Sequence, residues 1–257
     1  MERLNEKRTG GLSTRGLRIW GVLFLAAGIF GRSVLQNQFL GMATGSGEQL
    51  KLLMDSSDDA MIIATVALLL QAVETCAVPI FSFLLVEGVQ HTSNFGKYAA
   101  RVAGVAVLSE IPYNLAMGGK LLDLDTRNPA FALVLCLILL YFHKRYEERS
   151  ARNTAVKVIV CMAAVMWSLM LRVEYGVAMV ILTWVLWVFR KNSTYQGFAG
   201  ATAAVVCSLT SPFFMAAPMS FLVIHGYNGE KGEENRVLNY MAYPLLLLVI
   251  GIAAKTL

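Results

Sequence analysis

Charged residues are scarce in this chain of 257 residues: only 15% are Asp, Glu, Lys or Arg, whereas 56% are hydrophobic. The mean hydropathy is +0.58. So few charges cannot cover a soluble domain of this length, and the composition is typical of a protein with several membrane spans. An ordinary soluble enzyme is therefore excluded, and the expected partner of the chain is a lipid bilayer.

Cysteine is also scarce, and its spacing excludes two further classes of protein. The four cysteines lie singly inside apolar runs, at Cys76, Cys136, Cys161 and Cys207. Neither a CxxC pair nor a Cys/His ligand spacing is present, so we expect no disulfide framework and no metal site. These cysteines are interpreted as packing residues.

The basic residues indicate topology. The net charge is +5, but the basic residues lie in short segments between apolar runs, so we expect no nucleic acid partner. Nine apolar runs are predicted to span the membrane: 17–35, 60–90, 98–117, 128–142, 155–171, 176–189, 196–214, 217–224 and 238–254. With a cytoplasmic N-terminus, 16 of the 22 Lys and Arg residues lie inside, as the positive-inside rule requires.

The predicted fold class is therefore all-α, a polytopic transmembrane helical bundle of about nine spans in a bacterial cytoplasmic membrane. Residues 1–16 form a cytoplasmic tail and residues 17–257 a single domain, because no internal repeat or low-complexity linker is present. No signal-peptide pattern precedes the first apolar run, which we assign to the mature protein. Run 60–90 would make about 46 Å of helix, longer than the bilayer core, so Pro79, like Pro218, marks either a kink or a re-entrant segment.

Four sequence blocks resemble the TraX family of multispanning bacterial membrane proteins. They are PIFSFLLVEGVQHTSNFGKYAAR at 79–101, LSEIPYNLA at 108–116, GYNGEKG at 226–232 and NYMAYPLLLL at 239–248. The namesake of the family is linked to N-terminal acetylation of conjugative pilin. The resemblance implies an acyltransferase that takes acetyl-CoA or another acyl-CoA as donor.

The chain departs from that family at three places. An Asp-His pair usual in the first span is replaced by Gly28 and Ile29, and the histidine of a Tyr-Pro-x-His-Leu block is replaced by Leu246. An arginine usual before the proline-containing block gives way to Thr75. If the Asp-His pair supplies the general base in the family, this chain lacks it. A catalytically degenerate member, acting as a scaffold or subunit of a membrane assembly, is therefore the alternative interpretation.

Glu87 and His91 are the candidate catalytic residues. They are four residues apart, so a helix places them on one face. A carboxylate that holds an imidazole in one tautomer can prepare it to deprotonate an amine or hydroxyl for attack on a thioester. A polar pair at a helix end in the headgroup zone explains the same spacing equally well.

The donor is expected to bind the glycine-rich turn, where the backbone can approach phosphates closely and a lysine offers a charge. Arg101 would also bind the phosphates of the donor. An arginine that only marks the cytoplasmic end of a span fits that position too. The predicted donor-binding residues are Arg101, Tyr227, Asn228, Gly229, Lys231 and Gly232.

An acceptor cavity is predicted beside Pro112, where Glu110, Tyr113 and Asn114 lie three and four residues apart. Glu74, another acid in an apolar run, is expected to make a structural hydrogen bond to a neighbouring span. A transporter is the least favoured function, because embedded acids are few and repeats are absent.

Overall fold

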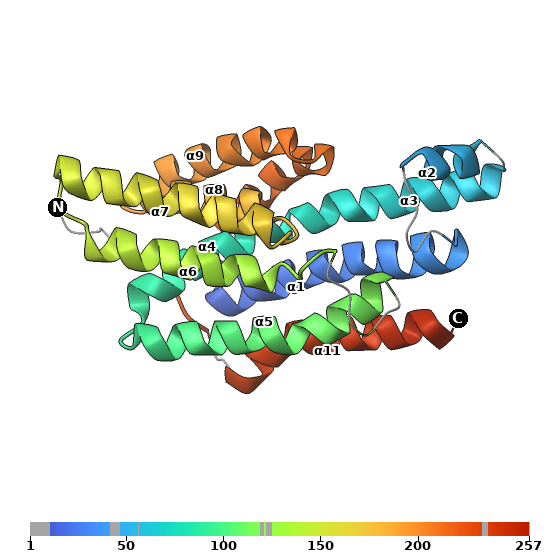
Figure 1. The fold of residues 1–257 in the computed structure, drawn as a ribbon, viewed down its shortest axis with the longest axis horizontal. Coiled ribbons are helices and arrows are strands. Elements are labelled where there is room, and N and C mark those ends of the chain that lie inside the picture. The colour runs from blue at the N-terminus through green and yellow to red at the C-terminus, as the bar shows by residue number, and fades with distance from the viewer. Residues whose placement is uncertain are drawn as a thin grey trace.

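The structure is a computed structural model that describes residues 11–41, 47–55, 57–118, 121, 125–232 and 236–256. Most of the predicted cytoplasmic tail lies outside these residues. The helices run mostly along the long axis of the molecule (Figure 1). They are α1 (Thr14–Phe30) continued by the π-helical segment η1 (Gly31–Phe39), α2 (Gly47–Met54), α3 (Asp58–Thr75), α4 (Ala77–His91), α5 (Phe95–Gly118), α6 (Ala130–Arg145), α7 (Ala151–Met170), α8 (Gly176–Val188), α9 (Ser193–Val206), α10 (Ser220–His225) and α11 (Arg236–Thr256).

The helix boundaries follow from local chemistry. Ser13 and Ser57 cap α1 and α3, because each side-chain oxygen accepts a hydrogen bond from the backbone N–H three residues on. The long apolar run breaks at Cys76, so that Pro79 falls in the first turn of α4. A proline is tolerated there because its missing N–H would have no partner within the helix.

The predicted all-helical bundle with apolar helices is confirmed, but the span count is lower. In the described chain, four helices are long and apolar enough to cross a membrane: Thr14–Phe39, Asp58–His91, Ala151–Met170 and Asn239–Thr256. Other predicted spans are too short or too polar by this criterion. Helix α8 has 13 residues, about 20 Å, whereas the hydrocarbon core is about 30 Å thick.

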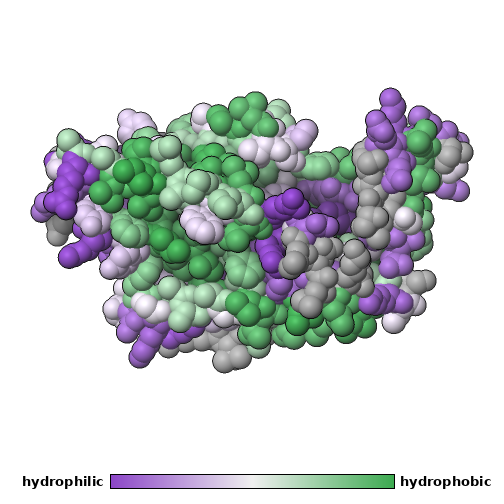
Figure 2. Space-filling view, viewed as in Figure 1, coloured by the Kyte–Doolittle hydropathy of each residue, from purple (hydrophilic) through white to green (hydrophobic). Residues whose placement is uncertain are grey.

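The bundle has one large core and a smaller one. Helices α4, α6 and α8 contribute most of the large core, and α1, α5 and α11 build the smaller one around Tyr113 and Leu247. Large apolar side chains on the outer faces stay exposed, as on α7 at Ile159, Met162 and Met170. Figure 2 shows this apolar surface over the middle of the molecule, with hydrophilic residues at the end where α6 meets α7. An apolar outer face of this kind fits contact with lipid.

Several sequence predictions near these helices need correction. The segment 36–59, between the first two predicted spans, is not simply a connection: it holds the end of η1, all of α2 and the first residues of α3. His143, which follows the predicted span 128–142, is buried rather than solvated: it is 4% exposed in the last turn of α6.

The α5–α11 contact depends on a small residue. At Gly251 of α11, an added Cβ would lie 3.2 Å from the backbone nitrogen of Ala116. We predict that Gly251→Leu lowers the free energy of unfolding by about 1–3 kcal/mol, because the α5 backbone cannot yield as a side chain can. Thermal unfolding in detergent measures this. Gly104→Leu is the control, because nothing lies within 4 Å of an added Cβ there; equal unfolding temperatures for the two variants would contradict the packing.

Candidate functional site

A cavity of about 550 Å³ opens where five segments meet: the starts of α1, α5 and α11, the end of α4 and the turn before α11. Basic and polar side chains form its wall: Arg18, His91, Thr92, Ser93, Asn94, Lys97, Tyr98, Arg101, Lys231, Asn239 and Tyr240, with Gly88. Four of these are Lys or Arg, and none of the described lining residues is acidic. We call it the cationic cavity, and its chemistry suits a ligand with several negative charges.

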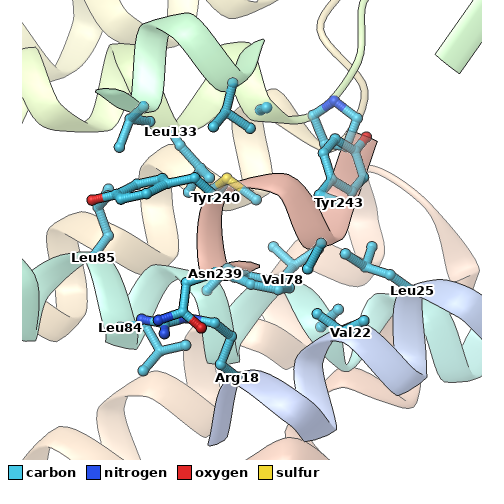
Figure 3. A pocket seen from close by; sticks show the side chains of 18 of the residues that line it. Arg18, Val22, Leu25, Val78, Leu84, Leu85, Leu133, Asn239, Tyr240 and Tyr243 are labelled. Atoms are coloured by element: carbon cyan, nitrogen blue, oxygen red, sulfur yellow. The ribbon is translucent and has the colours of Figure 1, made fainter. Parts of the chain in front are cut away.

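A second cavity, of about 160 Å³, adjoins the cationic cavity and is lined mainly by apolar side chains. We call it the apolar cavity; its walls come from α1, α4, α5, α6, α8 and α11. Arg18, Tyr98, Asn239 and Tyr240 line both cavities. Figure 3 shows Arg18 and Asn239 close together on one side of the apolar cavity, with the Tyr243 ring on another.

The predicted catalytic pair lies at the end of α4. Nδ1 of His91 lies 2.9 Å from the backbone oxygen of Glu87 and 3.6 Å from its carboxylate. When Nδ1–H donates to that carbonyl, Nε2 keeps a lone pair that can accept a proton. The His91 side chain is 66% exposed and lines the cationic cavity, whereas Glu87 is 13% exposed and accepts from Gln90. Glu87 therefore orients the imidazole mainly through its backbone.

The glycine-rich turn packs against the start of the described chain. Leu12 donates its backbone N–H to Gly226 and accepts from Asn228. An added Cβ at Gly232, whose φ is +71°, would lie 2.7 Å from Oγ of Ser13. These glycines thus serve close backbone packing as well as turning.

Of the predicted donor-binding residues, the cationic cavity brings together Arg101 and Lys231, beside His91. The others lie elsewhere in the turn. Tyr227 packs edge-on against Phe83 and lies 3.3 Å from the Thr14 hydroxyl, and the Asn228 side chain accepts from the backbone of Glu230. Gly229, with φ +79°, allows the chain to turn back.

The predicted acceptor residues face two different networks. Glu110 accepts from Arg127 at 2.8 Å and from Asn128 at 2.6 Å, in the segment before α6. Tyr113 donates to Glu174 at 2.9 Å, and Asn114 is 2% exposed. Glu110 and Tyr113 thus bind different partners, and a cavity shared by Glu110, Tyr113 and Asn114 stays a prediction.

A buried charged cluster of Arg32, Glu74 and Glu174 was not predicted from the sequence. Arg32 donates to Glu74 at 2.6 Å and also pairs with Glu174. The three side chains are 16%, 1% and 13% exposed, respectively. Two carboxylates thus share one guanidinium in an apolar bundle, which joins η1, α3 and the turn between α7 and α8. The hydrogen bond predicted for Glu74 is present, and because its donor is the Arg32 guanidinium it is also an ion pair.

The turn that carries Glu174 is tight and well anchored. Arg172 and Tyr175 have φ values of +51° and +56°, unusual for side chains of this size. The backbone of Arg127 donates to Arg172 and accepts from Glu174. Tyr175 also lines the apolar cavity and, with Glu174, a further cavity of about 380 Å³, which we call the vestibule.

A family profile described as TraX protein matches residues 46–254. The chain belongs to the TraX family. No curated protein and no solved structure matched the chain.

The three departures from the TraX family pattern have structural counterparts. Gly28 faces Glu74, and an added Cβ there would lie 2.1 Å from Oε2 of that carboxylate. Ile29 is 2% exposed, Leu246 packs against the smaller core, and Thr75 donates to backbone carbonyls. The glycine at the family's acidic position thus makes room for an acid from the facing helix.

Removing the cation of the charged cluster should be costly. We predict that Arg32→Met lowers the free energy of unfolding by about 3–5 kcal/mol, because it leaves two buried carboxylates without a counter-charge. Replacing Glu74 by Met in the same chain should recover part of the loss. Thermal unfolding in detergent tests both variants. Arg172→Met, at a side chain 67% exposed, is the control and should change little; an equal loss in control and Arg32→Met would refute a structural role of the cluster.

Proposed function

We propose that this TraX-family membrane protein is an acyltransferase that moves an acyl group from an acyl-CoA to an amine or hydroxyl acceptor at the membrane. The observation that carries the proposal is the cationic cavity with His91 on its wall. A CoA donor carries several phosphate charges, and Lys97, Arg101 and Lys231 can bind them. No salt bridge joins these three side chains to an acid within the described part of the chain.

In the proposed reaction, the acceptor nitrogen or oxygen attacks the thioester carbonyl and its proton passes to Nε2 of His91. The carbon–sulfur bond then breaks, and the CoA thiolate leaves and takes up a proton. The Glu87 carbonyl holds Nδ1–H and so keeps Nε2 as the proton acceptor. Tyr113, Glu174 and the vestibule residues are candidates for the acceptor side of the protein.

The alternative is a scaffold or subunit that has lost catalysis. It is favoured by the apolar side chains of Ile29 and Leu246, which stand where the family has histidines. It predicts that a partner protein co-purifies and that His91→Ala leaves function intact.

Variants at the cationic cavity separate donor binding from chemistry. We predict that Arg101→Gln and Lys231→Gln each weaken CoA binding about tenfold, the magnitude of one charged hydrogen bond. His91→Ala should leave CoA binding within about twofold but lower acetyl transfer or hydrolysis at least about a hundredfold. Calorimetry and thiol release on purified protein measure the two effects. Arg172→Gln, in the vestibule, is the charge-matched control; no acetyl-CoA binding by the native chain at millimolar donor would rule out the proposal.

The proposed topology places the cationic cavity on the cytoplasmic side and the vestibule on the outer side, as a cytosolic donor requires. In intact cells an impermeant maleimide should therefore label Asp125→Cys, at a side chain 83% exposed, but not Ser93→Cys, which lines the cationic cavity. Both variants carry Cys161→Ser, since that thiol is only partly buried. Ser93→Cys should react after permeabilisation. Labelling of Ser93→Cys in intact cells would contradict the proposed topology and place the cationic cavity on the outer side.

A further inference from the structure

The cationic and apolar cavities together have an amphipathic shape. They share Arg18, Tyr98, Asn239 and Tyr240, so a single elongated ligand can occupy both. The polarity changes along one face of α5. Lys97 and Arg101 line the cationic cavity, whereas Val102 and Val105 line the apolar one. Lys97 and Val105 lie eight positions apart, which corresponds to about 12 Å along the helix.

The apolar cavity has walls of a particular kind. Val22, Leu25, Val78 and Leu133 are among its lining residues, beside tyrosine rings (Figure 3). Mainly apolar walls favour a hydrocarbon ligand over a polar one. A polar group would lose its hydrogen bonds to water there, whereas each methylene of an alkyl chain gains free energy by burial.

We infer that the joined cavities bind a phosphate-bearing amphiphile, with its anionic head in the cationic cavity and an alkyl chain in the apolar cavity. This inference rests on the proposed function and deepens it: the acyl donor carries a chain of several methylenes, longer than acetyl. An acyl-CoA thioester and a phospholipid both have this chemistry, so the experiment must distinguish the two sources.

The test measures binding to the full chain in nanodiscs of a neutral lipid. The probes are CoA, acetyl-CoA, octanoyl-CoA and octanoyl lysophosphatidylglycerol, all below their critical micelle concentrations. Octanoyl-CoA should bind at least about tenfold more tightly than acetyl-CoA, which burial of only two of its six extra methylenes would achieve.

Two variants that fill the apolar cavity test the location of the chain. Leu133→Trp and Val22→Phe should remove the chain-length advantage and leave CoA binding within about twofold. Their matched controls are Ile138→Trp on α6 and Leu23→Phe on α1, at side chains 50% and 54% exposed outside the cavity. The controls should keep the advantage. Two cavity variants with separate controls protect the test against a single misfolded variant.

The binding results distinguish failure of the amphiphile inference from failure of the proposed function. Binding of CoA without a chain-length advantage, or an advantage that survives both filled-cavity variants, overturns the amphiphile inference while the donor site stands. Binding of the lysophospholipid that both filled-cavity variants weaken, with no binding of any CoA compound, supports the amphiphile inference and contradicts the proposed acyl-CoA donor. Binding of no probe overturns both.

Discussion

Charges in a bundle surrounded by lipid must be paired or must line a polar cavity, because hydrocarbon cannot solvate them. The described chain obeys this constraint in two ways. Toward one end of α1, Arg32 pairs with Glu74 and Glu174, and Glu110 pairs with Arg127. Toward the other end, basic residues line the cationic cavity, and no described lining residue is acidic. The first arrangement neutralises charge within the fold, whereas the second leaves the positive charges of Lys97, Arg101 and Lys231 available to an anionic ligand.

The two arrangements are connected by packing. Arg18 and Arg32 lie on the same helical segment, 14 residues and so about 21 Å apart. Between them the apolar cavity reaches from Tyr240 to Tyr175, which also borders the vestibule beside Glu174. The charged cluster therefore fixes the position of the wall that closes the apolar cavity. In the proposed acyltransferase, this framework would hold the donor site and the acceptor side at a fixed position relative to each other.

Sequence patterns predicted the helical bundle, the TraX family and three of the residues that meet at the cationic cavity. That Arg101, Lys231 and His91 meet at one cavity could be predicted from the sequence, because each lies beside a predicted span end on the same side of the membrane. The charged cluster could not be predicted in this way, for a physical reason. Arg32 and Glu174 lie near span ends, where a charge can reach water at little free-energy cost and is usually interpreted as a topology signal. Only the fold shows that Glu74, from a third segment, meets them. An acid opposite a glycine in a neighbouring apolar helix, as at Gly28, is the signal that would have suggested the pairing.

The most direct test of the account is an experimental structure of the full chain with CoA bound. The account predicts density for the CoA phosphates within hydrogen-bonding distance of Arg101 and Lys231, and the thiol end on the side of His91. Density for the nucleotide in the vestibule beside Arg172, or at a lipid-facing surface away from both basic residues, would contradict it.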